Sequence, residues 1–225
     1  MTRHDDREGH RERLRRRFFR EPEALPDYEL LELLLSMAQP RVDVKSVAKR
    51  LLRRFGSLGA VFAQDRDALK EVAGVGDASA AALVAVNEAA CRMLRHKAAE
   101  RPILASWDQL LDYVAVRMGN APREEFRVLY LDAKNKLIED EALQKGTVGE
   151  TAVYPREVVR RALELHATAF IMVHNHPSGD PTPSRADIAM TREVAEAGKA
   201  LGITLHDHLI IGGRGHASFK SLGLL

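Results

Sequence analysis

The sequence predicts an α/β fold in which a mixed sheet is flanked by helices and is preceded by a small all-helical domain. Two observations support this prediction. Up to about residue 101, the apolar residues recur with the spacing of helices. From residue 103 onward, short apolar runs with β-branched and aromatic members, such as residues 169–173, alternate with helix-like stretches.

The first hundred residues divide into an arm and a helical domain. Residues 1–20 hold eight arginines against four acidic residues, and we expect them to form a flexible basic arm. Residues 21–101 form the helical domain, and Arg101-Pro102 is the expected seam to a second domain over 102–225. Helices are expected from Asp27 and over residues 46–55, 66–72 and 77–96.

The second domain alternates between strand and helix patterns. Strands are expected near residues 126–131, 136–145, 169–174 and 205–211. Helices are expected near residues 106–118, 155–166 and 185–201. Gly146-Thr147 and Gly212-Gly213 mark turns, because glycine adopts backbone conformations that other residues avoid.

Two histidines and an aspartate can converge on one metal ion at the end of the strand near 169–174. His174 and His176 are two residues apart, so in a strand both imidazoles point to the same face. A proline-rich loop then turns the chain, and Asp187 falls in the first turn of the next helix. Two nitrogens and one carboxylate oxygen leave a fourth tetrahedral position for water, which is the arrangement of a catalytic zinc site. The sequence therefore predicts one bound Zn²⁺.

Other interpretations of these residues stay open. Ser184 and Asp187 are spaced as in a capping box, so both can simply cap the helix. His206 and His208 form a second H-x-H pattern, but it lacks a loop and a carboxylate partner, and Asp207 can instead orient a ligating imidazole. His216 is expected in an exposed loop. The lone Cys91 is expected to be a buried apolar residue and not a nucleophile.

The metal-ligand pattern resembles a known motif. His174-x-His176-Pro177 followed by Ser184-x-x-Asp187 resembles the JAMM signature of MPN-domain metalloproteases. Residues 174–180 resemble its bacterial RadC branch. The resemblance covers most of residues 103–225 and includes 154–157, 207–212 and 218–219.

The resemblance implies an MPN/JAMM-like fold and a zinc-dependent hydrolase, a metallopeptidase or isopeptidase, whose protein or peptide substrate is unknown. It also implies a glutamate that moves a proton and a serine, Ser184, that stabilises the oxyanion. We expect the glutamate to be Glu125, because it leads into an apolar strand. Glu124 would then point to the opposite face. Glu150 and Glu157 fit less well, because one lies beside a glycine and the other starts a helix.

Residues 72–76 resemble a helix-hairpin-helix turn. In that motif a G-x-G turn presents backbone amides at a helix N-terminus to a phosphate oxygen. Gly74 and Gly76 are therefore candidate phosphate-binding residues, and non-specific DNA is a candidate partner of the helical domain. A purely structural turn fits equally well, because Ala73 replaces the usual proline and Asp77 places a negative charge at the phosphate position.

Two functions follow from the sequence. The first is the zinc hydrolase, and the alternative is a DNA-binding, repair-associated accessory protein with a structural or vestigial metal site. Phosphodiester hydrolysis usually needs two metal ions about 3.5–4 Å apart, and the sequence offers one obvious set of ligands. The chain has no apolar run of about 18 residues and no signal-peptide core. We therefore expect a cytoplasmic protein that does not associate with membranes.

Overall fold

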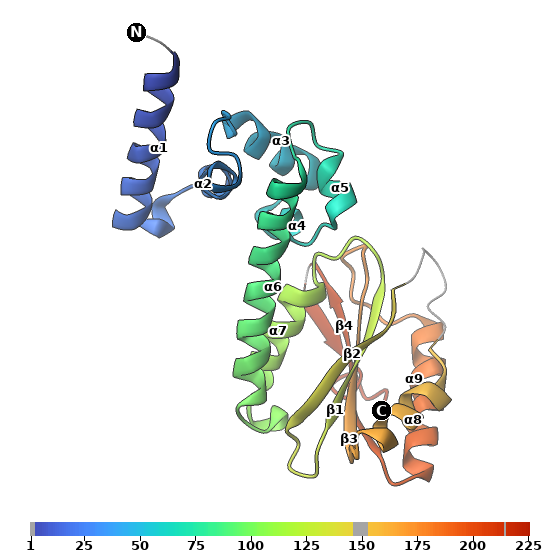
Figure 1. The fold of residues 1–225 in the computed structure, drawn as a ribbon. Coiled ribbons are helices and arrows are strands. Elements are labelled where there is room, and N and C mark those ends of the chain that lie inside the picture. Colours follow the sequence, from blue (N-terminus) through green and yellow to red (C-terminus); the bar gives the residue numbers. More distant parts are fainter. Residues whose placement is uncertain (1–2, 146–152, 214) are drawn as a thin grey trace. The chain divides into compact units, whose positions relative to one another are not determined.

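The computed structural model describes residues 3–145, 153–213 and 215–225 (Figure 1). The chain forms two compact units, Met1–Ala89 and Ala90–Leu225. The first unit is built from helices, and the second contains a mixed sheet with helices. The predicted fold class is therefore confirmed. The turn expected at Gly146-Thr147 and the candidate Glu150 lie outside the described residues.

The first unit packs short helices around a leucine-rich core. Leu31, Leu35, Leu51, Leu69 and Leu83 are fully buried in this core. Helix α4 was not expected, and the Ser57 side chain caps it by accepting a hydrogen bond from the Ala60 amide. The elements are α1 (Arg3–Arg20), the 3-10 helix η1 (Pro22–Ala24), α2 (Asp27–Ala38), α3 (Lys45–Phe55), α4 (Leu58–Phe62), α5 (Arg66–Lys70) and the first part of α6 (Asp77–Ala99).

Residues 3–20 form helix α1 and not the unstructured arm that their composition predicts. Leu14 is buried in the first unit. Two contacts tie α1 to α2: Arg17 Nη2 lies 2.8 Å from Glu29 Oε2, and His10 Nε2 lies 2.8 Å from Glu32 Oε1. Buried glutamates on α2 thus hold the basic segment, and these partners are 12 and 22 residues away in sequence.

The turn before α6 is held by side chains of α2 and α3. Gly74 has a φ of +93°, and a Cβ atom there would lie 2.8 Å from Val47 Cγ2. Arg50 Nη2 donates to the Ala73 carbonyl at 2.7 Å, and Gln39 Nε2 donates to the Gly74 carbonyl at 2.9 Å. The packing of the turn therefore accounts for Gly74.

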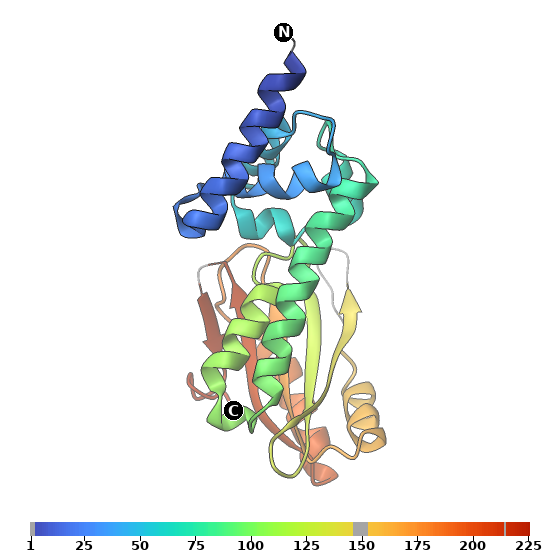
Figure 2. The same ribbon diagram turned by 60° about the vertical axis from the view of Figure 1, so that its left-hand side comes forward.

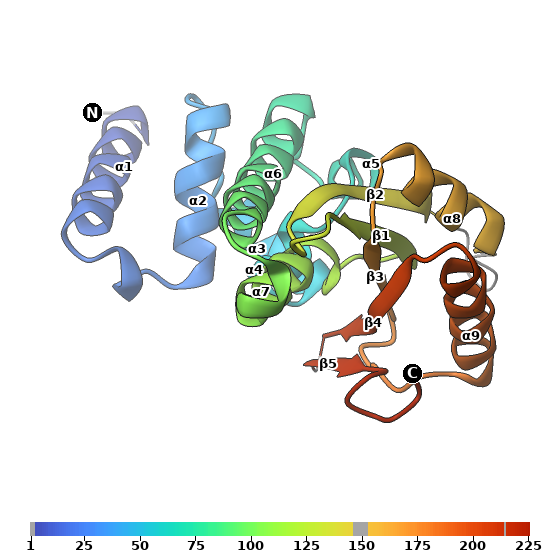
Figure 3. The same ribbon diagram turned by 90° about the horizontal axis from the view of Figure 1, so that it is seen from below.

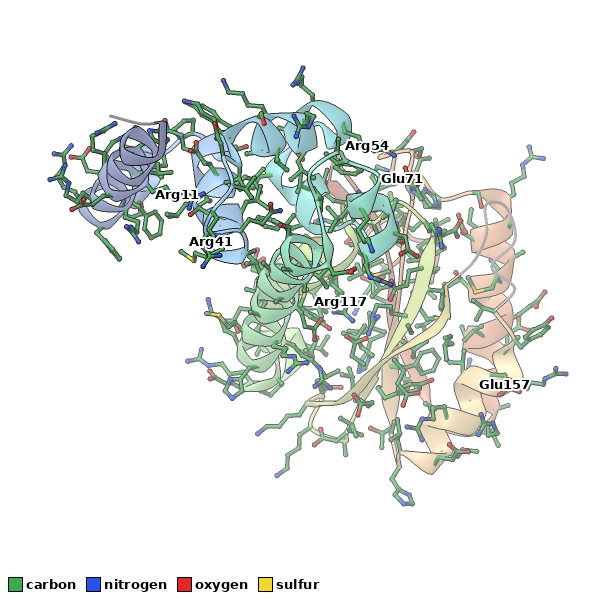
Figure 4. The ribbon with its side chains drawn as sticks, turned by 45° about the horizontal axis from the view of Figure 1, so that its top comes forward. Arg11, Arg41, Arg54, Glu71, Arg117 and Glu157 are labelled. Atoms are coloured by element: carbon green, nitrogen blue, oxygen red, sulfur yellow. The ribbon has the colours of Figure 1, made fainter. Side chains whose placement is uncertain are left out.

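The surroundings of Gly76 differ from those of Gly74. No side chain or backbone atom lies within 4 Å of a Cβ built on Gly76. The neighbouring Asp77 carboxylate accepts hydrogen bonds from Arg66 and Lys70, each at 2.9 Å. Beyond α5, Glu71 forms an ion pair with Arg54 of α3 (Figure 4). Arg54, Arg66 and Lys70 thus already have acidic partners. Phosphate binding at Gly74 and Gly76 stays a prediction.

The second unit contains a five-stranded sheet in the order β2-β1-β3-β4-β5. β3 and β4 are parallel, and the other neighbours are antiparallel. Gly212 and Gly213 turn the chain as expected, but the return strand β5 was not expected. The strands are β1 (Glu125–Leu131), β2 (Leu137–Lys145), β3 (Ala169–Asn175), β4 (Thr204–Gly212) and β5 (Gly215–Ser218).

Helices cover both faces of this sheet. Seen from below, α7 (Trp107–Met118) lies on one face, and α8 (Pro155–Glu164) and α9 (Arg185–Ala200) lie on the other (Figure 3). The short 3-10 helix η2 (Ile103–Ala105) precedes α7. Among the described residues, no helix is both long and apolar enough to cross a membrane.

Alternate residues of β1 and β3 enter two separate cores. Leu129 and Ile171 pack on the α7 face, whereas Val128, Phe170 and Met172 pack on the α8–α9 face. This alternation continues to the ends of the strands. His174 therefore lies on the same face as Met172, toward α9.

The boundary between the compact units falls within α6, between Ala89 and Ala90, whereas the sequence placed the seam at Arg101-Pro102. Cys91 and Ala98 of α6 are buried in the same core as Leu110 of α7. Figure 2 shows α7 beside this part of α6. Cys91 is buried, as expected. The composition changes at residue 101, but the last part of α6, from Ala90 to Ala99, already packs with the second unit.

We predict that Gly74→Ala destabilises the protein and that Gly76→Ala does not. An alanine at Gly74 must adopt a positive φ and displace Val47, which should lower the free energy of unfolding by about 1–3 kcal/mol. An alanine at Gly76 meets open space and should leave stability unchanged or raise it by up to about 1 kcal/mol. Urea unfolding of both variants measures the difference. Equal effects would contradict this account of the turn.

Candidate metal centre

His174 and His176 lie at the end of β3, on the face toward α9. His174 is 1% exposed, and its ring stacks on Phe126 with centroids 5.9 Å apart. The His176 amide donates to the Ile211 carbonyl of β4 at 2.9 Å. Strands on both sides of β3 thus hold the chain that carries the two imidazoles.

Asp187 lies in the first turn of α9, as predicted. Its amide donates to Ser184 Oγ at 3.1 Å, and its Oδ2 accepts from the Ser184 amide at 2.7 Å. The capping box is therefore present. It also fixes the Asp187 carboxylate at the start of the helix, where it faces both imidazoles. Capping and metal binding are compatible uses of the same two residues.

The three predicted ligand atoms converge. His174 Nε2 lies 3.0 Å from His176 Nε2 and 3.4 Å from Asp187 Oδ1, and His176 Nε2 lies 3.6 Å from Asp187 Oδ2. Donors about 2.0–2.1 Å from a tetrahedral zinc ion lie roughly 3.3 Å from one another. The spacing and the N,N,O chemistry of this cluster therefore fit one Zn²⁺. It is the one such cluster within residues 3–145, 153–213 and 215–225.

The protonation of both histidines suits metal binding. His176 Nδ1 lies 2.8 Å from the Asp180 carbonyl, which can only accept, so Nδ1 carries a proton and Nε2 is free in the neutral ring. His174 Nδ1 lies 2.8 Å from His208 Nε2. Burial lowers the pKa of His174 to about 4 and lowers the pKa of His208 well below its ordinary value. The rings of His174 and His208 are therefore neutral at pH 7.

The prediction that Glu125 serves this site is wrong in its geometry. The Glu125 carboxylate pairs with Arg127, and Arg127 Nε donates to Asp140 Oδ1 at 2.8 Å. These residues lie on the α7 side of β1, as does the buried Tyr113 hydroxyl that donates to Asp140. Glu125 is thus directed away from the histidines.

Glu124 occupies the position for which Glu125 was predicted. Its carboxyl lies close enough to His176 and Asp187 for both to change its pKa. Burial raises the pKa of Glu124, the charge of His176 lowers it, and the charge of Asp187 raises it. The pairing of Phe126 with His174 explains this placement, because residues 124 and 126 share the histidine face.

Asn175 lies between the two histidines and points to the opposite face. Its side-chain oxygen accepts from the Glu125 amide at 2.8 Å, and its side-chain nitrogen donates to the Arg123 carbonyl at 3.1 Å. Asn175 therefore holds the backbone on both sides of Glu124. The sequence offered no signal for this role, because it depends on contacts 50 and 52 residues apart.

Asp207 does not orient a metal ligand, contrary to one interpretation of the sequence. Its carboxylate accepts from the Lys220 amide at 3.0 Å and from the Ser218 hydroxyl. A bulge in β4 leaves His206 without a partner in β3, and its ring hydrogen-bonds to Asn135. His208, which follows the bulge, is the residue that contacts His174.

The remaining candidates lie away from the cluster. Glu157 is on α8, where it accepts hydrogen bonds from Arg160. Figure 4 marks it on that helix. His216 is exposed, as predicted, although it lies in β5 and not in a loop.

Acidification should destabilise the metal-free protein. Because the pKa values of His174 and His208 are lowered in the folded state, only the unfolded chain gains these protons as the pH falls below about 6.5. Each histidine should then lower the free energy of unfolding by about 1.4 kcal/mol per pH unit. Urea unfolding with a chelator at about pH 7 and about pH 5.5 measures this slope.

The raised pKa of Glu124 has the opposite effect on stability. As the pH falls, the Glu124 carboxylate is protonated in the folded state before it is protonated in the unfolded chain, which raises the free energy of unfolding. The measurement is therefore made on Glu124→Gln. A free energy of unfolding that stays constant or rises on acidification would show that the two buried histidines are not held neutral by the fold.

Comparison with known proteins shows the family of this chain. A family model described as a RadC-like JAB domain matches residues 104–224, and one described as UPF0758 N-terminal matches residues 3–81. A UPF0758 protein of Rhodobacter capsulatus is 57% identical over 203 residues, which cover 90% of this chain and 95% of that protein. The chain therefore belongs to the RadC (UPF0758) family.

Proposed function

We propose that this protein is a zinc-dependent hydrolase that cleaves peptide or isopeptide bonds. One observation supports the proposal above all others: two imidazoles and the Asp187 carboxylate converge, and the Glu124 carboxyl is close enough to His176 and Asp187 for both to change its pKa. Membership of a family with a JAB domain agrees with this chemistry. The substrate class is a protein or peptide.

His174, His176 and Asp187 would hold the metal. Zinc supplies a Lewis acid that polarises a carbonyl group and lowers the pKa of a coordinated water to about 7. Glu124 accepts the proton of the attacking water and delivers it to the leaving amine, a contribution of about 10²–10⁴-fold. Partial burial suits this role, because a raised pKa lets a carboxyl group both accept and return a proton near neutral pH.

Ser184 can stabilise the developing oxyanion. Its oxygen accepts a hydrogen bond from the Asp187 amide at 3.1 Å. The hydroxyl proton therefore stays available for donation to a substrate oxygen. The side chain is exposed and lies at the N-terminus of α9, where the helix dipole also favours negative charge. A single oxyanion donor contributes about 10²–10³-fold.

We predict that Glu124→Gln abolishes most turnover and that Glu125→Gln does not. The zinc-loaded protein is screened against a proteome-derived peptide library, and cleavage products are identified by mass spectrometry. On the substrate found, Glu124→Gln should lower kcat by about 10²–10⁴-fold with its zinc content unchanged. Glu125→Gln is the matched control, because it removes the neighbouring charge on the other face of the strand.

Two outcomes would contradict the hydrolase proposal. Full turnover by Glu124→Gln would remove Glu124 as the proton carrier. Absence of zinc-dependent cleavage in the whole library would instead favour the accessory role, in which the metal site is structural or vestigial. In that case DNA binding, with its steep dependence on salt, becomes the next measurement.

Ser184→Gly should separate catalysis from helix capping. Glycine is tolerated at the N-cap at a cost of about a few tenths of a kcal/mol, so α9 and the position of Asp187 should persist. Loss of the hydroxyl should lower kcat by about 10²–10³-fold with little change in KM. An unchanged kcat would restrict Ser184 to its capping role.

A further inference from the structure

A buried chain of hydrogen bonds leads from the backbone of one proposed metal ligand to the ring of another. The Thr191 hydroxyl donates to the Asp187 carbonyl at 2.5 Å. His208 Nδ1 lies 2.6 Å from Thr191 Oγ1, and His208 Nε2 lies 2.8 Å from His174 Nδ1. Thr191 and His208 are fully buried, and His174 is 1% exposed.

The chemistry of these atoms fixes the position of every proton in the chain. A carbonyl oxygen can only accept, so Thr191 must use its hydroxyl proton on Asp187 and accept from His208 Nδ1. Neutral His208 carries one ring proton, so its Nε2 must accept from His174 Nδ1. His174 Nε2 is then left with a lone pair, which faces the other two ligand atoms.

The fold places the two outer residues of this chain by separate means. Thr191 follows Asp187 by one turn of α9 and is aligned by the same helix. His208 reaches the face of His174 because of the bulge in β4. Its ring is held by stacking against Phe219, with centroids 4.6 Å apart, and by a tilted contact with Phe126 at 5.7 Å.

We propose that His208 and Thr191 are positioning residues that hold His174 in the tautomer whose Nε2 is free to bind metal. The proposal rests on the zinc site proposed above. Ligating histidines commonly donate their second ring N–H to a partner that fixes the ring and its tautomer. Here that partner is a second buried histidine, whose own tautomer is set through Thr191 by the backbone of Asp187.

The first test needs neither metal nor substrate. Long-range ¹H–¹⁵N NMR of the metal-free, full-length protein reports which ring nitrogen of each histidine carries the proton. The expected result is that His174 and His208 are both protonated on Nδ1. Protonation of His174 on Nε2 would overturn the proposal.

The second test measures zinc affinity by chelator competition in three variants. Thr191→Val removes the hydroxyl while keeping the branched shape, and it should weaken zinc binding by about 10–100-fold and give a mixture of tautomers at His208 and His174. Thr191→Ser restores the hydroxyl and should restore both readouts. His206→Gln is the control on the same strand, since its ring contacts Asn135 and not the site, and it should bind zinc as the wild type does.

The two proposals fail in different ways. If Thr191→Val binds zinc as tightly as the wild type and keeps both tautomers, the positioning role is wrong although the zinc site stands. If the wild type takes up no zinc, the zinc proposal fails, and the tautomers in the metal-free protein then decide by themselves whether the hydrogen-bond chain orients His174.

Discussion

The register between β1 and β3 decides the geometry of the whole proposed metal centre. Phe126 pairs with His174, so residues of even number in both strands face α9. A shift of one residue would exchange the two faces of β1. It would then bring Glu125 and Arg127 toward the histidines and turn Glu124 to the α7 face. Because each face packs into its own apolar core, such a shift would also place each apolar side chain of β1 in the wrong core, and the cores therefore hold the register.

The two faces of this sheet carry different groups: the α9 face carries the proposed metal site, and the α7 face carries side chains that hold the backbone in place. On the α9 face, one helix carries Ser184, Asp187 and Thr191, so the helix cap, a proposed ligand and a hydrogen-bonding hydroxyl belong to the same element. On the α7 face, Asn175 fixes the backbone around Glu124. On the same face, Arg127 forms buried ion pairs with Glu125 and Asp140. Buried polar groups of this kind need complete hydrogen bonding, and these residues supply it to one another.

Local patterns predicted most of the elements but not their packing. Helices α2, α3 and α5 to α9 and strands β1 to β4 were expected within a few residues of their observed bounds, because apolar periodicity reports which face of an element is buried. Helix α1 was missed, since its stability depends on Glu29 and Glu32 of α2. Strand β5 was missed because a four-residue edge strand carries almost no periodic signal.

The cluster of proposed metal ligands could be predicted from the sequence because its spacing is local: two histidines lie on one strand face, and an aspartate follows in the first turn of the next helix. The sequence could not show which glutamate faces this cluster, since Glu124 and Glu125 are adjacent and only the pairing with β3 distinguishes them. The same holds for His208, which reaches His174 through a bulge that H-D-H gives no sign of. The sequence by itself determines side-chain type and spacing. Strand register and the contacts between distant residues are decided only when the sheet assembles.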